Sequence, residues 1–415
     1  MQRLVILGAG TAGTIVANRL RRRLSLPTWQ ITVVDHETAH LYQPGLLFVP
    51  FGGGQPGELI RPRPRSLATG IAFIDGEIDR VEPAARTVAL ADGRTIGYDF
   101  LVIASGTQPR PDQTPGMLGP QWRQSIHEFY TLDGALALRH ELARFALRGG
   151  RLVVHIVDMP IKCPVAPLEF AFLADAHLRA LGVRDTVQIT YVTPLSGAFT
   201  KPVAAAHLAS MLDDRKIGLE TDFLVERIDD MHRELVSYDE RRIPFDLLVT
   251  VPLNMGADFV ARSGLGDELN FVPVDKHTLR SRAHDEIFAI GDAADLPTSK
   301  AGSVAHFAAE VFVENFVRLT RGEPMSAEFD GHANCFVETG DDKALLIDFD
   351  YDTEPLPGVY PLPVVGPLRL LRQTRLNHWG KLAFAWLYWH VLLPGRRLPL
   401  PAAMSMTGKH RPEEE

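Results

Sequence analysis

Apolar runs of strand length recur along the chain, and stretches with apolar residues at helical spacing separate them. Near the N-terminus the order is strand, helix, strand, which is typical of a parallel sheet covered by helices. In this part and in one later segment, the pattern predicts buried strands at Leu4–Leu7, Gln30–Asp35, Tyr98–Ala104 and Ile287–Ile290, with helices at Thr14–Arg23 and from Val304 to about Leu319.

The middle of the chain repeats this alternation. It predicts strands Arg151–Val157, Gln188–Val192 and Phe245–Thr250, with helices Leu168–Leu181 and Val203–Arg215. The fold class is therefore α/β, with two tandem Rossmann-like domains. We expect the first domain at 1–110 and 272–322, the second at 111–271, and a C-terminal region at 323–415 that holds short strands, the proline-rich connector Pro355–Pro367 and a terminal helical stretch.

A glycine turn joins the first strand to the first helix. It reads Gly8-Ala9-Gly10-Thr11-Ala12-Gly13, and Asp35 ends the next strand about 20 residues further on. Such glycines allow a tight turn and close approach to a pyrophosphate, which the helix N-terminus stabilises. Asp35 is expected to accept hydrogen bonds from the adenosine ribose. The turn predicts a bound dinucleotide.

Two further segments indicate which dinucleotide binds. The strand Tyr98–Ala104 runs into Ser105-Gly106, a variant of the crossover found in flavin reductases. The strand Ile287–Ile290 runs into Gly291-Asp292, where a carboxylate suits a ribityl hydroxyl, and Gly302 opens the following helix. Together with the first turn, these elements resemble the two-dinucleotide-domain flavoprotein fold and favour FAD over NAD.

The middle domain lacks the corresponding glycine turn. After Arg151–Val157 the chain reads Asp158-Met159-Pro160-Ile161-Lys162-Cys163-Pro164-Val165-Ala166-Pro167, with no glycine to let the backbone approach a pyrophosphate. Its second strand ends in Thr193-Pro194 rather than in an acid. A thiol therefore stands where NAD(P)H would bind. The chain has two cysteines, and counting alone leaves open whether they are buried thiols or a redox pair.

Composition and charge narrow the function class. A net charge of −8 gives no basic face for nucleic acid. The first residues already form a core strand, so we expect no signal peptide, and no apolar run is long enough for a spanning helix. A cytoplasmic protein follows, in which a structural disulfide is improbable. No metal site is expected, and a homo-oligomer is left open.

The C-terminal region has a distinct chemistry. Leu376–Leu393 holds three of the five tryptophans, and Leu368–Arg397 has six Arg or Lys residues and no acid. An apolar, aromatic and basic stretch too short to span a bilayer predicts an amphipathic helix that lies in one leaflet. We therefore expect a peripheral, monotopic protein on the cytoplasmic side of the cell membrane. A helix that packs on the core is the alternative.

At this point the chain resembles the sulfide:quinone oxidoreductases, nearly end to end. The segments that carry the resemblance are Pro160-Ile161-Lys162-Cys163 with Ala166-Pro167, Gly291-Asp292 with Pro297–His306, Asn334-Cys335-Phe336, Gly380-Lys381-Leu382-Ala383-Phe384, Tyr388-Trp389 and Leu392–Arg396. Many members carry a third cysteine, where this chain has Tyr130, so non-covalent FAD is expected.

The resemblance assigns roles to individual residues. It implies that Cys163 and Cys335 carry sulfur beside the flavin, that Glu169 moves protons, and that Phe336 and Phe384 flank a quinone ring. Lys162 and the start of the following helix are expected to favour the Cys163 thiolate. The expected FAD contacts are Gly8, Ala9, Gly10, Thr11, Ala12, Gly13, Asp35, His36, Gln43, Ile78, Ala104, Ser105, Gly106, Gly291, Asp292, Gly302 and Lys381, the last also near the quinone.

The function that these residues predict is oxidation of hydrogen sulfide to sulfane sulfur or polysulfide, with electrons passing through FAD to ubiquinone or menaquinone. A type II NADH:quinone oxidoreductase, or another FAD-dependent pyridine nucleotide-disulfide oxidoreductase, is the first alternative, but it needs the missing second glycine turn. The flavoprotein subunit of a flavocytochrome sulfide dehydrogenase should carry an export signal. A flavin-bound sulfur-sensing protein without turnover is a further alternative.

Overall fold

A computed structural model describes residues 1–362, 366–398 and 401–410. The first sheet has the order β21-β9-β1-β2-β5, and all its neighbours are parallel. Its core strand β1 is buried on both faces, with Leu4–Leu7 at most 1% exposed, as expected for a parallel strand covered by helices. The strands are β1 (Gln2–Leu7), β2 (Trp29–Asp35), β5 (Ile71–Asp75), β9 (Phe100–Ile103) and β21 (Ile287–Ala289).

The second sheet repeats this architecture in the order β11-β18-β12-β13-β14, again with parallel neighbours. The mixed α/β fold with two Rossmann-type sheets is therefore as predicted. The strands are β11 (Ile126–His127), β12 (Gly150–Ile156), β13 (Val187–Val192), β14 (Ile217–Glu220) and β18 (Leu247–Val251).

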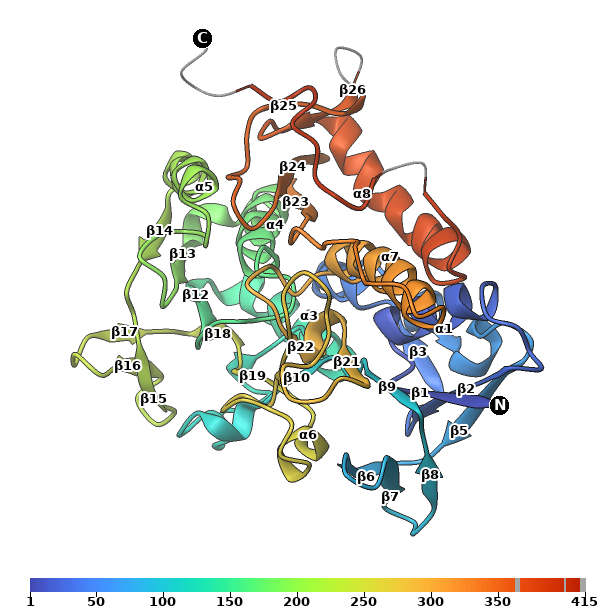
Figure 1. Cartoon of the computed structure of the whole chain (residues 1–415). Helices are drawn as coiled ribbons and strands as arrows, with labels where there is room; N and C mark the ends of the chain where they lie inside the picture. Colours follow the sequence, from blue (N-terminus) through green and yellow to red (C-terminus); the bar gives the residue numbers. More distant parts are fainter. Residues whose placement is uncertain (363–365, 399–400, 411–415) are drawn as a thin grey trace.

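A third sheet, in the order β23-β24-β26-β25, belongs to the C-terminal region (Figure 1). Its strands are β23 (Ala333–Gly340), β24 (Lys343–Phe349), β25 (Gly358–Leu362) and β26 (Gly366–Leu370). The predicted connector Pro355–Pro367 is therefore not a simple linker, because it contains β25 and the start of β26, which pair antiparallel. Its residues 363–365 lie outside the described residues.

Helices join and cover the sheets at positions close to the predicted ones. The helices α1 and α7 begin two or three residues before the predicted positions Thr14 and Val304, because their small first-turn residues carry no apolar pattern. The helices are α1 (Thr11–Arg21), α2 (Pro56–Leu59), α3 (Leu132–Arg148), α4 (Ala166–Ala180), α5 (Pro202–Asp214), α6 (Asp258–Arg262), α7 (Gly302–Leu319) and α8 (Arg375–Leu387), with a π-helical turn η6 (Tyr388–Leu392) and 3₁₀ turns η1 (Gln43–Phe51), η2 (Arg63–Ser66), η3 (Pro111–Gln113), η4 (Arg184–Thr186) and η5 (Gly291–Ala293).

Short strand pairs and meanders complete the fold. They are β3 (Ala39–Leu41) with β4 (Ile60–Pro62), β6 (Ile78–Glu82) with β7 (Thr87–Leu90) and β8 (Thr95–Gly97), β10 (Thr107–Pro109) with β19 (Asn254–Gly256), β15 (Val225–Asp229) with β16 (Glu234–Ser237) and β17 (Arg242–Pro244), and β20 (Val272–Pro273) with β22 (Ala294–Asp295).

The helix α8 links the third sheet to the first domain. It packs on β23, β24 and β26, and in Figure 1 it runs from the β26 end of that sheet toward α1. No helix among the described residues is long and apolar enough to cross a membrane. The C-terminal region thus contacts both Rossmann-type domains, because β23 packs on α7 of the first and on α4 of the second.

Candidate active site

The first glycine turn has the geometry that a dinucleotide requires. Gly8 has a φ of +103°, and a Cβ there would lie 2.4 Å from the carbonyl oxygen of Ala104. A Cβ on Gly13 would lie 2.0 Å from the carbonyl oxygen of Gly8, so both positions need glycine. At Gly10 a Cβ would meet nothing within 4 Å. The turn is therefore tightly packed at Gly8 and Gly13, whereas free space remains at Gly10, at the N-terminus of α1.

The other predicted flavin segments show the same openness. A Cβ on Gly106 or Gly302 would also meet nothing within 4 Å. The Ser105 hydroxyl is buried and has no hydrogen-bond partner among the described residues, which is costly unless a ligand supplies one. Burial raises the pKa of Asp292, against the opposing charges of Lys300 and Lys162. These features fit a bound FAD.

Asp35 is already engaged within the protein. Its carboxylate accepts a hydrogen bond from the Ala9 N–H at 2.6 Å and pairs with the Arg63 guanidinium. Arg63 was not predicted, because nothing in its local sequence indicates that β4 and η2 return to the end of β2. The predicted contacts His36 and Gln43 are exposed, and Ile78, at the start of β6, is half-buried.

The glycine turn also contacts the C-terminal region. The Tyr388 hydroxyl lies 2.7 Å from Thr11 Oγ1 and 2.6 Å from His40 Nε2. Burial raises the pKa of Tyr388, so its hydroxyl keeps its proton. The turn η6 therefore packs directly beside the predicted cofactor segment, a contact between residues far apart in sequence that the local pattern does not reveal.

Cys163 lies in the loop between β12 and α4, where a nicotinamide-binding enzyme would have its glycine turn. Its φ of +47° is a left-handed conformation that non-glycine residues adopt rarely, and such strained residues are enriched at active sites. Its N–H donates to the Lys300 carbonyl oxygen at 2.7 Å, and its own carbonyl accepts from Ala166 N–H at 2.8 Å. The backbone thus fixes the thiol in place.

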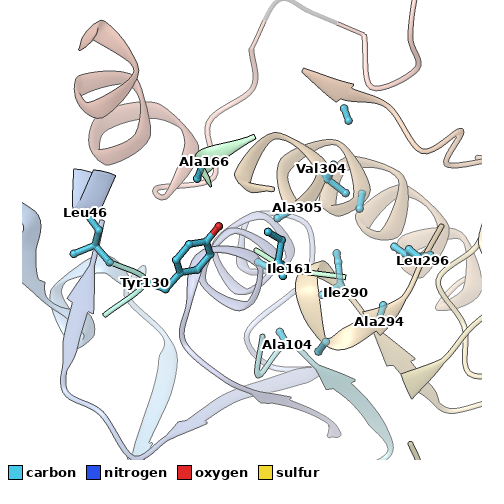
Figure 2. Close-up of a cluster of buried hydrophobic side chains, with 14 of the residues drawn as sticks. Leu46, Ala104, Tyr130, Ile161, Ala166, Ile290, Ala294, Leu296, Val304 and Ala305 are labelled. Carbon is cyan, nitrogen blue, oxygen red and sulfur yellow. The ribbon is translucent and has the colours of Figure 1, made fainter. Parts of the chain in front are cut away.

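Tyr130 lies beside this loop. Its hydroxyl donates to the Cys163 carbonyl oxygen at 3.4 Å. Figure 2 shows Tyr130 in a buried cluster with Leu46, Ile161 and Ala166. The residue that stands in place of the third cysteine of the resembled family is therefore a neighbour of Cys163.

The two cysteines share one site, although they are far apart in sequence. Both are free thiols and half-buried, and α4 packs on β23, which carries Cys335. Burial raises the pKa of Cys163, and the charges of Glu169 and Cys335 raise it further. Burial and the Glu169 charge raise the pKa of Cys335 to about 12, while Lys381 and a hydrogen bond with Ser303 oppose them.

Glu169 and Lys381 form a buried ion pair next to both thiols. Glu169 is 1% exposed; its Oε1 pairs with Lys381 Nζ and accepts from the Glu338 N–H at 2.6 Å. Lys381 also donates to the Phe336 carbonyl oxygen at 3.2 Å. Burial opposes the charge of Lys381, but Glu169, Cys163 and Glu338 outweigh it and raise its pKa. Burial likewise raises the pKa of Glu169, partly offset by Lys381.

A second buried carboxylate extends this cluster toward the surface. Glu338 is 1% exposed, and both of its carboxylate oxygens lie 3.0 Å from His378 Nδ1. Burial raises the pKa of Glu338 against the nearby charges of Lys381 and His378. Glu169 thus pairs with Lys381 and Glu338 with His378, and the Lys381 charge also acts on Glu338. Neither Glu338 nor His378 was predicted, since only the packing of α8 on β23 brings them together.

The predicted quinone residues lie on the same two elements. Phe336 follows Cys335 on β23, and Phe384 is on α8; both are half-buried. A Cβ on Gly380 would lie 2.9 Å from the Phe336 ring, so glycine lets α8 approach the strand closely. The Lys381 ammonium lies 5.8 Å from the ring centroid of Phe48, so η1 also borders the lysine.

Two details differ from the predicted sulfur site. The cation whose charge lowers the pKa of Cys163 is Lys381 rather than Lys162, whose charge interacts with Asp292 instead. The following helix, predicted from Leu168, begins at Ala166. In the described part of the chain, no group of three His, Cys, Asp or Glu residues is arranged to hold a metal ion.

A family model described as pyridine nucleotide-disulphide oxidoreductase matches residues 2–311. The chain belongs to this family. Mitochondrial sulfide:quinone oxidoreductase of Mus musculus is 24% identical over 359 residues, covering 85% of this chain and 79% of that protein. Its counterpart from Dictyostelium discoideum is 26% identical over 405 residues, covering 95% and 86%.

A solved structure, the sulfide:quinone oxidoreductase of Aquifex aeolicus, has a TM-score of 0.79 at 21% identity and covers 95% of this chain and 92% of that one. The predicted resemblance to sulfide:quinone oxidoreductases is thus confirmed, and so is the mixed α/β fold with Rossmann-type domains. This family member is an FAD-dependent oxidoreductase, as the glycine turns predicted.

Proposed function

We propose that this protein oxidises hydrogen sulfide to sulfane sulfur or polysulfide and passes the electrons through FAD to ubiquinone or menaquinone. One observation carries the proposal: Cys163, in the loop that replaces a nicotinamide turn, shares its buried surroundings with Cys335, Glu169 and Lys381. The relatives named sulfide:quinone oxidoreductase support the same activity.

The turn Gly8–Gly13 would hold the FAD pyrophosphate at the N-terminus of α1, and Asp35 would orient the ribose. Ser105 offers its unpartnered hydroxyl, and Asp292 a carboxylate, to the rest of the cofactor. His36, Gln43, Ile78, Ala104, Gly106, Gly291 and Gly302 complete the proposed contacts, without a covalent link. When bound, FAD supplies a two-electron acceptor that a quinone can reoxidise.

The two cysteines would carry the sulfur. Hydrosulfide attacks one sulfur of an oxidised Cys163–Cys335 disulfide; the S–S bond breaks, the attacked cysteine becomes a persulfide, and the other leaves as a thiolate. Joining the persulfide to that thiolate as a trisulfide would release two electrons and one proton, and bound FAD would supply the two-electron acceptor. Further rounds lengthen the sulfur chain before it leaves.

Glu169 and Lys381 are placed to handle charge and protons in these steps. Lys381 stabilises whichever cysteine is a thiolate, since its charge lowers the pKa of both. The raised pKa of Glu169 brings this carboxyl closer to the range in which it can take the proton released by the persulfide. Glu338 and His378 continue the line of titratable groups away from the thiols.

Quinone would reach the site from the C-terminal region. Phe336 and Phe384 would flank its ring, with Lys381 near its oxygens. The helix α8 exposes an apolar row, Leu376 at 40%, Trp379 at 61%, Leu382 at 51% and Trp386 at 63%. This row supports peripheral contact with the cytoplasmic face of the cell membrane, from which a lipid quinone must come.

The domain division predicted at 1–110 with 272–322, 111–271 and 323–415 is also proposed. The strand content of the three sheets supports it, because each sheet draws its strands from one of these parts. The cofactor would bind in the first part, the Cys163 loop belongs to the second, and Cys335, Phe336 and Lys381 come from the third.

The test is an anaerobic titration of the purified yellow protein, followed by flavin absorbance. We expect sulfide to bleach the flavin and NADH to leave it oxidised. Cys163→Ser and Cys335→Ser should retain FAD and lose sulfide-dependent quinone reduction at least about 100-fold, because each removes one end of the sulfur relay.

Two of the alternatives predict a different result in this titration. Bleaching by NADH at a rate comparable to sulfide would favour a type II NADH:quinone oxidoreductase. A single bleaching by sulfide, with no turnover when quinone is added, would favour the sulfur-sensing protein. Full activity in either serine variant would show that the substituted cysteine is an ordinary buried thiol with no part in the sulfur relay.

A further inference from the structure

A cavity of about 480 Å³ lies outside the candidate active site, between α1, the segment 61–68 and the turn that follows η6. Arg22, Arg61 and Arg65 line it, together with Asn18, Trp389 and Leu393. No acidic side chain is among the described residues of its wall. We call it the arginine cavity.

Contacts within the protein hold the walls of this cavity together. The Arg22 guanidinium donates to the carbonyl oxygens of Gly395 at 2.8 Å and Pro394 at 2.7 Å. The Asn18 side-chain amide donates to the carbonyl oxygens of Ser66 at 2.7 Å and Leu393 at 2.9 Å. One asparagine thus ties both remaining segments to α1, so the arginine cavity is a built feature rather than a chance hollow.

Its positive charge is not neutralised. In the described part of the chain, Arg22, Arg61 and Arg65 have no carboxylate within ion-pair distance, whereas the intervening Arg63 pairs with Asp35 and Glu37. The Arg61 guanidinium lies 4.4 Å from the Trp389 ring centroid, which orients it while its edge N–H groups stay available. Planar guanidinium groups suit a phosphate, which they can bind with two donors each.

The arginine cavity lies next to the apolar row of α8. Trp386, in that row, and Trp389, in the cavity wall, are three residues apart, about 5 Å along a helix axis. The headgroup layer of a bilayer is about 5–8 Å thick on each side. With α8 lying along the membrane surface and its apolar row at the hydrocarbon boundary, the cavity therefore lies about one helical turn beyond the end of the row, within reach of the lipid phosphates.

We propose that the arginine cavity binds the phosphate of an anionic phospholipid headgroup. This rests on the membrane contact in the proposed function and names the lipid chemistry that it selects. Arg61 and Arg65 contact the phosphate, and Trp389 and Leu393 face the glycerol end. A free phosphate ion offers the same oxygens, but the adjoining apolar row favours a lipid as the source.

The experiment uses the full-length, FAD-loaded protein and vesicles of phosphatidylcholine with or without phosphatidylglycerol, at low and high salt. The double variant Arg61→Gln/Arg65→Gln should lose about tenfold or more in affinity for phosphatidylglycerol vesicles. Binding to pure phosphatidylcholine, and flavin bleaching by sulfide, should not change. Arg22 is left intact because it supports the fold of the C-terminal turn.

Two controls separate a built site from net charge. Arg80→Gln/Arg227→Gln removes the same charge from exposed positions on β6 and β15 and should retain most of the affinity. Arg61→Lys/Arg65→Lys keeps the charge but not the planar donors, and should lose part of it. Flavin absorbance and far-ultraviolet circular dichroism verify folding of every variant.

Equal losses in the cavity and control double variants would overturn the proposal. Calorimetric titration with inorganic phosphate tests the other source: phosphate binding that needs Arg61 and Arg65, without any preference for phosphatidylglycerol, would also overturn the lipid assignment. Failure of the proposed function is visible separately, as absence of flavin bleaching by sulfide in the unmodified protein.

Discussion

At the scale of single residues, the charge of Glu169 changes the pKa values of the two thiols and therefore their reactivity. A thiol reacts as its thiolate, and below its pKa the thiolate fraction rises tenfold for each pH unit. The Glu169 charge raises the pKa of both Cys163 and Cys335, whereas Lys381 lowers it. Burial is the largest cause that keeps the resting thiols protonated and the Glu169 charge adds to it, so loss of that charge should make both thiols more reactive.

Substitution of Glu169 is therefore expected to speed alkylation of the thiols and to slow turnover. Glu169→Gln removes the negative charge and keeps Lys381, so both thiol pKa values should fall and alkylation by iodoacetamide at a fixed pH near 8 should become about threefold or more faster. Turnover with sulfide and quinone should fall about 100-fold, because the proton acceptor is gone. Mass spectrometry of the alkylated peptides measures the first effect.

Glu314→Gln is the matched control, because it removes an exposed carboxylate on α7 and should change neither rate. Unchanged or slower alkylation in Glu169→Gln would mean that Glu169 is already protonated in the resting protein, and that its charge does not control the thiols.

At the scale of elements, α8 and η6 have two separate tasks. The row Leu376, Trp379, Leu382 and Trp386 faces outward, while η6 turns inward, with Tyr388 2% and Trp389 7% exposed. The prediction that all of Leu376–Leu393 lies in one leaflet therefore does not hold for Trp389, because this ring turns inward and packs against His40, Tyr42 and Arg61. Deleting the whole segment would damage the core as well as the outward face.

Substitution of the outward row is the cleaner test. Trp379→Gln/Trp386→Gln should lower the affinity for phosphatidylcholine vesicles about tenfold or more, because both rings lose apolar contact with the interface. The loss should persist at high salt, and FAD should remain bound. Vesicle co-sedimentation measures it. Leu147→Gln, at an exposed leucine of α3, should have no effect; equal binding by the double tryptophan variant would show that membranes are met elsewhere.

At the scale of the whole molecule, one buried ion pair fastens the C-terminal segment to the third sheet. Lys409 Nζ lies 2.5 Å from Asp348 Oδ2, and both side chains are 1% exposed. His332 Nε2 lies 2.8 Å from the other carboxylate oxygen. Burial opposes ionisation of Asp348, but His332 and Lys409 outweigh it and lower the pKa of this carboxyl.

Lys409→Met should therefore lower the free energy of unfolding by about 3 kcal/mol at pH 7, since it leaves Asp348 buried without its cation. The folded pKa of Asp348 lies below its unfolded value, so the stabilisation is complete above about pH 4 and is lost as the pH falls through the folded pKa. Urea unfolding at a series of pH values should show the difference between wild type and variant shrinking in acid.

The control for this prediction is Arg80→Met, which breaks an exposed pair with Glu82 and should change stability little at any pH. A difference for Lys409→Met that stays constant down to pH 3 would contradict the assignment to Asp348.

Local sequence determined the parts of this protein that depend on local physics. The turn Gly8–Gly13 was predictable because only glycine permits its backbone conformation, and the buried strands because parallel strands are apolar on both faces. The replacement of a second glycine turn by Cys163 was visible for the same reason. These features indicated the fold and the cofactor class, whereas the sulfur chemistry of the two cysteines was implied by the resemblance to the sulfide:quinone oxidoreductases.

Tertiary structure decided which distant residues meet. Glu338 and His378 join Glu169 and Lys381 only because α8 packs on β23, and Tyr388 reaches Thr11 only because η6 returns to the first domain. No local pattern specifies such pairings, since hydrophobic periodicity fixes which face of an element is buried but not what covers it. The sequence therefore determined the chemistry of each segment, and the packing of the C-terminal region determined the charges that control it.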